Sequence, residues 1–182
     1  MTLKHSELIH QGRIIRLEQH TVEFPDGSTG QLDVVRHPGA AAVVPLLDDP
    51  GSPDPRVLLI RQFRHAVGGW LWEIPAGRLD PGEKDHPEQC AKRELKEETG
   101  CTAASMRLLL SIVTTPGFSD EVIHLFLATG LTRGEAAREE DEFMELHELP
   151  LSKVRKMIQS NEITDAKTLV GLTYVQCYEI KG

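Results

Sequence analysis

The sequence predicts a domain of the α+β class, in which helices follow strands and a region of antiparallel strands comes first. Short apolar runs separated by Pro- and Gly-rich turns indicate strands, and three longer stretches indicate helices. A chain of 182 residues is long enough for one domain with a sizeable core. We therefore expect a strand region over residues 1–38 and the main domain over residues 39–182.

The first part of the chain is expected to be mostly strands. Residues 7–35 should form short strands around a turn at residues 25–28, where Pro, Asp, Gly and Ser follow one another. Residues 40–47 and 57–63 are apolar enough to be buried strands. The segment between them, residues 48–55, holds three prolines and a glycine, so it is expected to be a loop.

Helix boundaries are clearest around residues 87–99, which follow a brief strand at residues 71–74. Pro87 suits the first turn of a helix, and Gly100 suits the position just past its end. The remaining elements are expected to be strands over residues 108–114, 122–128 and 143–146, then helices over residues 151–159 and 165–178.

The composition excludes several classes of protein. A formal net charge of −8 argues against a general nucleic-acid or membrane binder, so we expect neither partner. The three cysteines are odd in number and lack Cys-x-x-Cys spacing, which favours free thiols in a reducing compartment. No apolar run reaches membrane-spanning length, and the N-terminus lacks a secretory signal. A cytoplasmic location is the expectation.

Three glutamates give the predicted helix at residues 87–99 an acidic face. Glu94, Glu97 and Glu98 stand at i, i+3 and i+4, so they share one side of the helix and repel one another. Carboxylate oxygens suit Mg²⁺ or Mn²⁺, and Mg²⁺ usually completes its shell with substrate phosphates. The alternative is a solvated acidic face that Lys92 and Lys96 partly neutralise.

The surrounding residues resemble the Nudix box. Gly77 and Glu83 keep the first spacing of that motif, and residues 93–101 keep its last block, with Cys101 in place of the usual aliphatic residue. Nine residues separate Glu83 from Arg93, two more than in the motif. A loop before the helix can absorb this insertion at little cost. It leaves the role of Glu83 unassigned.

Other segments are similar to the ADP-ribose pyrophosphatase branch of the Nudix family. Pro116 stands fifteen residues after Cys101, as that branch requires. The same branch resembles this chain at Arg61-Gln-Phe-Arg64, Glu73-Ile-Pro-Ala-Gly77, Glu140-Asp-Glu-Phe143 and Asp165-Ala-Lys-Thr168.

The resemblance implies a fold, an activity and an assembly. The fold would be an α/β/α sandwich with a mixed central sheet, in which the box forms a loop–helix–loop unit. The activity would be hydrolysis of ADP-ribose to AMP and ribose 5-phosphate with Mg²⁺ or Mn²⁺, more than one ion per site. The assembly would be a homodimer that exchanges its N-terminal strands, with residues 1–38 as the dimerisation region.

The resemblance also implies the metal ligands and the base. The ligands would be Glu94, Glu97 and Glu98 together with the carbonyl of Ala76, and Glu97 would have a catalytic role as well. Arg93 would orient Glu97 or Glu98. The carboxylate that positions the attacking water would come from a downstream loop, where Glu142 fits best and Glu140 is the reserve. The alternative for that loop is a merely solvating acidic run.

Four residues are candidates for binding the substrate. Arg64 is assigned to the diphosphate because a guanidinium matches phosphate oxygens, and Arg61 would face the other side of its strand. Arg36 is a weaker candidate, from the same chain or a dimer partner, and a structural ion pair is the alternative for both Arg64 and Arg36. Glu73 would hold the terminal ribose or a metal-bound water, or else be structural. Phe118 would contact the ribose or close the core.

Base recognition is weakly encoded, which leaves alternatives for the function. The N-terminal region offers Ile14, Ile15 and Leu32, with Phe24 as its one aromatic residue. An aliphatic sandwich selects a purine less strictly, so a hydrolase of another nucleoside diphosphate sugar is the first alternative. A nucleotide-binding Nudix module without turnover is the second.

Overall fold

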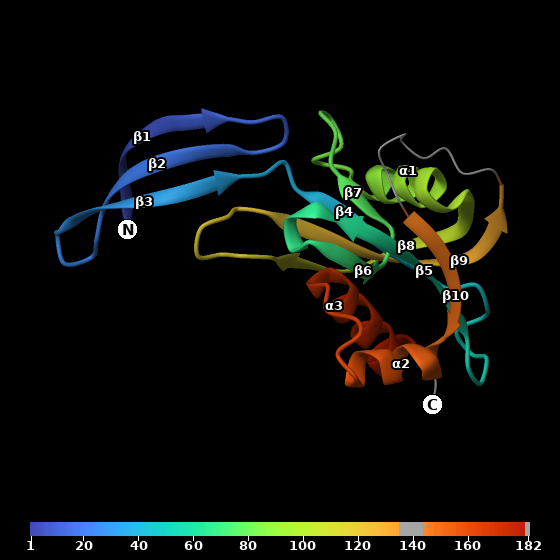
Figure 1. Ribbon diagram of the computed structural model, residues 1–182. Coiled ribbons are helices and arrows are strands. Elements are labelled where there is room, and N and C mark those ends of the chain that lie inside the picture. The colour runs from blue at the N-terminus through green and yellow to red at the C-terminus, as the bar shows by residue number, and fades with distance from the viewer. Residues whose placement is uncertain (135–143, 181–182) are drawn as a thin grey trace.

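The computed structural model describes residues 1–134 and 144–180 (Figure 1). The helices are α1 (Pro87–Thr99), α2 (Leu151–Gln159) and α3 (Ala166–Tyr174), and a π-helical turn, Val175–Glu179, continues α3. The strands are β1 (Thr2–Gln11), β2 (Arg16–Glu23), β3 (Thr29–Arg36), β4 (Ala40–Pro45), β5 (Arg56–Arg64), β6 (Gly69–Glu73), β7 (Ala76–Arg78), β8 (Cys101–Val113), β9 (Val122–Arg133) and β10 (Met144–Pro150).

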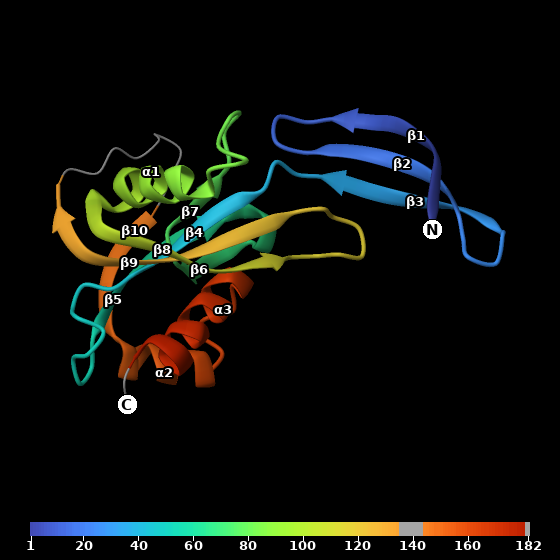
Figure 2. The same ribbon diagram turned by 180° about the vertical axis from the view of Figure 1, so that it is seen from behind.

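The N-terminal strands form a separate sheet of order β1-β2-β3, antiparallel throughout. Figures 1 and 2 show this sheet extending to one side of the rest of the molecule. The end of β3 is attached to the turn between β8 and β9, because the amide of Val35 donates a hydrogen bond to the carbonyl of Phe118 at 2.7 Å. Every residue of β1 is exposed, so this strand packs against no core of its own chain. The predicted N-terminal strands are confirmed, and the first begins at Thr2.

The main domain contains two further sheets. One has the order β7-β4-β9-β8, in which β4 and β9 are parallel and the other pairs are antiparallel. The other has the order β10-β5-β6 and is antiparallel. Helix α1 covers one side of the strands, and α2 and α3 cover the opposite side (Figure 2). This arrangement confirms the predicted sandwich with a mixed sheet.

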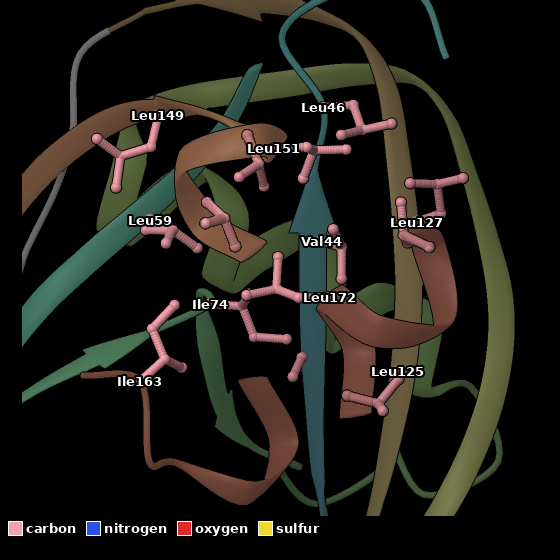
Figure 3. Packing of buried hydrophobic residues seen from close by; sticks show 14 of the residues in the cluster. Val44, Leu46, Leu59, Ile74, Leu125, Leu127, Leu149, Leu151, Ile163 and Leu172 are labelled. Atoms are coloured by element: carbon pink, nitrogen blue, oxygen red, sulfur yellow. The ribbon is translucent and has the colours of Figure 1, made fainter. Parts of the chain in front are cut away.

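Strand β4 divides the core into two parts. Its residues are all buried, and successive side chains point to opposite faces of a strand. Ala40, Ala42 and Val44 pack on the side of α2 and α3, whereas Ala41 and Val43 pack on the side of α1. Figure 3 shows the larger cluster, which includes Val44, Leu46, Leu59, Ile74, Leu125, Leu127, Leu149, Leu151, Ile163 and Leu172. Complete burial of one such aliphatic side chain contributes about 1.5–3 kcal/mol.

The predicted elements are present, and several boundaries differ. Strand β10 continues to Pro150, four residues past its predicted end, and its predicted first residue, Phe143, lies outside the described residues. Strand β7 was not expected, because three residues are too few to show alternation. Strands β8 and β9 extend well beyond the predicted ranges because they pair with each other along nearly their whole length. Asp165 caps α3 instead of belonging to it, since its side chain accepts from the amide of Thr168.

No helix in the described part of the chain has the length and apolarity needed to cross a membrane.

Candidate active site

Helix α1 is held in place at both ends. Pro87 occupies its first turn, and Gly100 ends it in the left-handed conformation, with φ of 73° and its amide bonded to the carbonyl of Lys96 at 2.8 Å. Its buried face combines apolar residues, such as Leu95, with the carboxylates Glu94 and Glu98. The side chain of Glu97 is 42% exposed. The predicted acidic face therefore consists of two buried glutamates and one accessible one.

The chain at Ala76 and Gly77, before α1, contacts these two buried glutamates. A Cβ atom at Gly77 would lie 1.9 Å from Oε1 of Glu94, so any larger residue there would displace this carboxylate from its position. The amide of Ala76 donates to Oε2 of Glu98 at 3.0 Å. Ala76 itself pairs with Ala42 in the mixed sheet. The mixed sheet thus positions Ala76 and Gly77, which we call the box turn, and this turn positions Glu94 and Glu98.

Arg93 lies among three carboxylates. It donates to Glu83 at 3.2 and 3.3 Å, to Glu97 at 3.0 Å and to Glu94. Burial alone would lower the pKa of Arg93, but the hydrogen bond with Glu83 and the charge of Glu94 raise that pKa above its ordinary value. The hydrogen bond from Arg93 lowers the pKa of Glu83. Glu83 therefore contacts Arg93 of the box despite the inserted residues.

The donor chemistry of the box suits a hard cation, although its carboxylates point elsewhere. Among residues 1–134 and 144–180, no three His, Cys, Asp or Glu side chains gather closely enough to hold a metal ion as they stand. Glu94 and Glu97 are turned toward Arg93. Carboxylate oxygens and a backbone carbonyl are nevertheless the ligands that Mg²⁺ and Mn²⁺ prefer. Binding an ion here requires these glutamates to turn away from Arg93.

Two predicted substrate residues, Arg64 and Glu73, contact each other. Arg64 donates from Nε to Oε1 of Glu73 at 2.7 Å and from Nη2 to Oε2 at 2.8 Å. Glu73 is 1% exposed and also accepts from Lys167, which donates to Asp165 at 3.0 Å. Burial raises the pKa of Glu73, but the hydrogen bond from Arg64 and the charge of Lys167 outweigh it, so the net pKa is lowered.

The pair also lies within electrostatic reach of the box. The hydrogen bond with Glu73 raises the pKa of Arg64 against the opposing effect of burial, and the negative charge of Glu98 contributes to the rise. Arg61, three residues earlier, lies instead over the ring of Trp70 at 5.5 Å. The structure thus brings Arg64, Glu73 and Glu98 into one neighbourhood and gives Arg61 a different one.

Arg36 has a different set of neighbours from Arg64. It donates to Glu18 and to Asp120, each at 3.0 Å. It also lines a cavity of about 850 Å³ between the N-terminal sheet and the box loop. The basic residues lining this cavity are Arg13, Arg16, Arg36, His37, Arg78, Lys84 and His124. Arg64 and the glutamates of α1 are not among the residues that line it.

The other predicted residues lie apart or outside the described chain. Phe118 is 54% exposed at the turn between β8 and β9, and its carbonyl rather than its ring holds β3. Glu140 and Glu142 lie outside the described residues.

Sequence reasoning missed Lys167 and the partner of Glu83. The segment from Asp165 to Thr168 was noted as a branch feature, but nothing in its spacing indicates a contact with Glu73, 94 residues earlier. For Glu83, the insertion obscured a contact that Arg93 makes across the loop.

Comparisons with known proteins agree with this geometry. The NUDIX domain family matches residues 36–169. The methanol dehydrogenase activator of Bacillus methanolicus is 40% identical over 176 residues, covering 96% of this chain and 91% of that protein. The ADP-ribose pyrophosphatase of Bacillus subtilis is 41% identical over 175 residues, covering 95% and 91%. A crystal structure of an ADP compounds hydrolase has the same fold, with a TM-score of 0.83 over 97% of this chain and 92% of that one, at 22% identity. The box geometry, the family match and these relatives together show that the chain belongs to the Nudix hydrolase family.

Proposed function

We propose that this chain is a divalent-metal-dependent hydrolase that splits the diphosphate of ADP-ribose into AMP and ribose 5-phosphate. The observation that carries the proposal is the docking of α1 on the box turn, with Glu94 against Gly77 and Glu98 on the amide of Ala76. The name of the B. subtilis relative, an ADP-ribose pyrophosphatase at 41% identity, supports the choice of substrate.

The metal ligands in this proposal are Glu94, Glu97, Glu98 and the carbonyl oxygen of Ala76. They would hold Mg²⁺ or Mn²⁺, with more than one ion per site, because these oxygens suit hard cations. Bound ions of this kind neutralise charge on phosphoryl oxygens and lower the pKa of a bound water. On the protein side, Arg93 balances part of the repulsion between Glu94 and Glu97 before they turn toward an ion.

Arg64 and Arg36 are the proposed substrate contacts. Arg64 is 40% exposed beside the charge of Glu98, so it can bind the diphosphate next to the box. Arg36 belongs to the basic cavity, which would attract the anionic substrate toward a protein of net negative charge. Phe118 would contact a ribose at the turn it occupies. We assign Glu73 to holding Arg64, since both of its oxygens accept hydrogen bonds within the protein.

Glu142 is the proposed residue that positions the attacking water, with Glu140 as its alternative and Glu97 as a further candidate. A comparison of Glu142→Gln with Glu140→Gln separates the first two. The larger loss of kcat identifies the carboxylate that takes part in proton transfer, typically about 10²–10⁴-fold.

A substrate panel tests the proposal. The purified protein would be incubated with Mg²⁺ or Mn²⁺ and with ADP-ribose or other nucleoside diphosphate-linked compounds, and AMP and ribose 5-phosphate would be quantified. Glu98→Gln should abolish turnover. Glu88→Gln is the matched control, because Glu88 lies on the same helix but pairs with Lys92 at the surface. Cleavage of no compound, or full activity of Glu98→Gln, would contradict the proposal.

The same panel addresses two alternatives. Ile14 and Ile15, in the connection between β1 and β2, and Leu32, on β3, are 40–45% exposed. The ring of Phe24 packs against Gly30, so the N-terminal region offers no free aromatic platform to select adenine. This favours another nucleoside diphosphate sugar as the second candidate. The name of the B. methanolicus relative, an activator of a dehydrogenase, supports a regulatory module as the other alternative function. Nucleotide binding by calorimetry without any product would support that module.

We also propose a homodimer formed through residues 1–38. The exposure of β1, with Leu3, Leu8 and Ile9 at 50–56%, supports it, since exposed large apolar side chains grouped on one strand favour association. Sedimentation of Leu8→Glu beside the wild type tests the idea, and a monomeric wild type with full activity would overturn it. A cytoplasmic location is proposed on the free thiols of Cys90, Cys101 and Cys177.

A further inference from the structure

We propose that Lys167 and Asp165, at the start of α3, are positioning residues for the reaction. They hold the carboxylate of Glu73, and Glu73 in turn holds the guanidinium of Arg64 in the orientation that receives the diphosphate. The inference rests on the proposed function in one respect, the assignment of Arg64 to the phosphates.

The hydrogen bonds leave Arg64 oriented with one edge available. Nε and Nη2 both donate to Glu73, which fixes the plane of the guanidinium. Within the described chain, no hydrogen bond of Nη1 is recorded, and the side chain is 40% exposed. Glu73 is almost completely buried, with a bond to each of its oxygens, so it orients Arg64 from behind.

Lys167 determines how strongly Glu73 binds Arg64. Lys167 donates to the same oxygen, Oε2, that accepts from Nη2 of Arg64. Its side chain is 11% exposed, so solvent screens this contact little. Lys167 therefore holds the carboxylate of Glu73 in the position that orients Arg64.

Asp165 connects this cluster to the fold. Its Oδ2 accepts from Lys167 at 3.0 Å, from the amide of Thr168 at 3.0 Å and from the Thr168 hydroxyl at 2.6 Å. The Thr168 hydroxyl accepts from the amide of Ile74 at 2.9 Å, two residues before Ala76. The first turn of α3 thus places Lys167 against Glu73 and also holds the strand end that leads into the box turn.

A kinetic comparison tests the proposal. Lys167→Met should raise the KM for ADP-ribose about tenfold while kcat stays within about twofold, because a charge-assisted hydrogen bond is lost behind a binding residue. Lys167→Arg should restore most of the affinity. Arg155→Met is the matched control, since it removes a cation on α2 that contacts Gln176. The control should leave KM unchanged.

A double-mutant cycle separates positioning from general stability. In an Arg64→Met background, Lys167→Met should change KM by less than about twofold, because its effect passes through Arg64. Effects that multiply in the double variant would overturn the proposal, as would a fall in kcat and melting temperature without a change in KM. If Lys167→Met fails to fold, Asp165→Asn takes its place, because asparagine keeps the helix cap while removing the charge. It should raise KM about threefold by weakening one charged contact.

The design keeps the two proposals distinguishable. If the wild type cleaves a different panel compound, the cycle is run with that compound and the positioning proposal is judged unchanged. If the wild type cleaves none, the proposed function fails, and the cycle is run on the Kd for ADP-ribose by calorimetry. A wild type that cleaves no panel compound and does not bind ADP-ribose would overturn both.

Discussion

The box and the cluster formed by Arg64, Glu73, Asp165 and Lys167 have opposite arrangements of charge. In the box, a single cation, Arg93, lies among Glu83, Glu94 and Glu97. In the other cluster, the single carboxylate of Glu73 lies between Arg64 and Lys167, and Asp165 balances the second cation. The first arrangement has an excess of negative charge, which a divalent ion would relieve. The second has balanced charges and is largely buried except at Arg64, so it keeps its shape without a ligand.

The comparison predicts that removing a box carboxylate has the largest effect on activity. Glu94→Gln should lower kcat/KM about a thousandfold, because several kcal/mol of charge stabilisation are lost with a metal ligand. Steady-state kinetics with ADP-ribose and Mg²⁺ measures this. Activity within about tenfold of the wild type would mean that the excess charge of the box is not used for metal binding.

Crowding the box should cost less than removing a carboxylate. In Gly77→Ala the new Cβ displaces the carboxylate of Glu94, whose atoms would otherwise lie 1.9–2.5 Å away. We expect kcat/KM to fall roughly 10- to 100-fold, as for loss of a supporting contact around a metal. Gly69→Ala is the control, because a Cβ there meets no atom within 4 Å. Equal activity of the two variants would show that Glu94 need not lie against the turn.

Removing the box cation should affect stability in a metal-dependent way. Arg93→Met leaves three carboxylates without their shared partner, and it should lower the free energy of unfolding by roughly 1–2 kcal/mol after allowance for the partial exposure of Arg93. Urea denaturation with and without Mg²⁺ measures this, and Mg²⁺ should recover part of the loss. Lys92→Met, which removes an exposed cation from the same helix, should change stability little. A loss that Mg²⁺ does not reduce would contradict the charge argument.

The smallest effect is expected in the N-terminal sheet, where Glu18 repeats the arrangement of Glu73. Hydrogen bonds from His20 and Arg36 lower the pKa of Glu18 from 4.5 to about 2. Because the folded pKa is the lower one, the stabilisation is complete above pH 4.5 and is lost as the pH falls toward 2. Glu18→Gln should therefore flatten the decline of melting temperature between these pH values. Glu7→Gln, on exposed β1, should leave the decline unchanged.

The parts of the fold that depend on local sequence could be predicted. Pro87 and Gly100 gave the bounds of α1, because caps act within one turn of a helix. The length of β8 could not be predicted, since its exposed residues carry little pattern and only the pairing with β9 extends it.

The same distinction holds for the site. The box glutamates follow a fixed helical spacing, so their shared location is evident from the sequence. The contact between Glu73 and Lys167 arises when α3 packs near the end of β6, and no local pattern encodes it. The separation of Arg36 from Arg64 is likewise a tertiary fact, because β3 belongs to a different sheet from β5.

Strand β4 gives neighbouring positions in the sequence different structural neighbours. Val43 lies in the cluster beneath helix α1, and Val44 lies in the cluster beneath α3, whose first turn contains Lys167. We therefore expect a change of side-chain volume at Val43 to affect the box first, and a change at Val44 to affect the cluster that holds Arg64 first. If the two proposals hold, substitutions at these two adjacent valines should adjust metal affinity and substrate affinity independently from within the core.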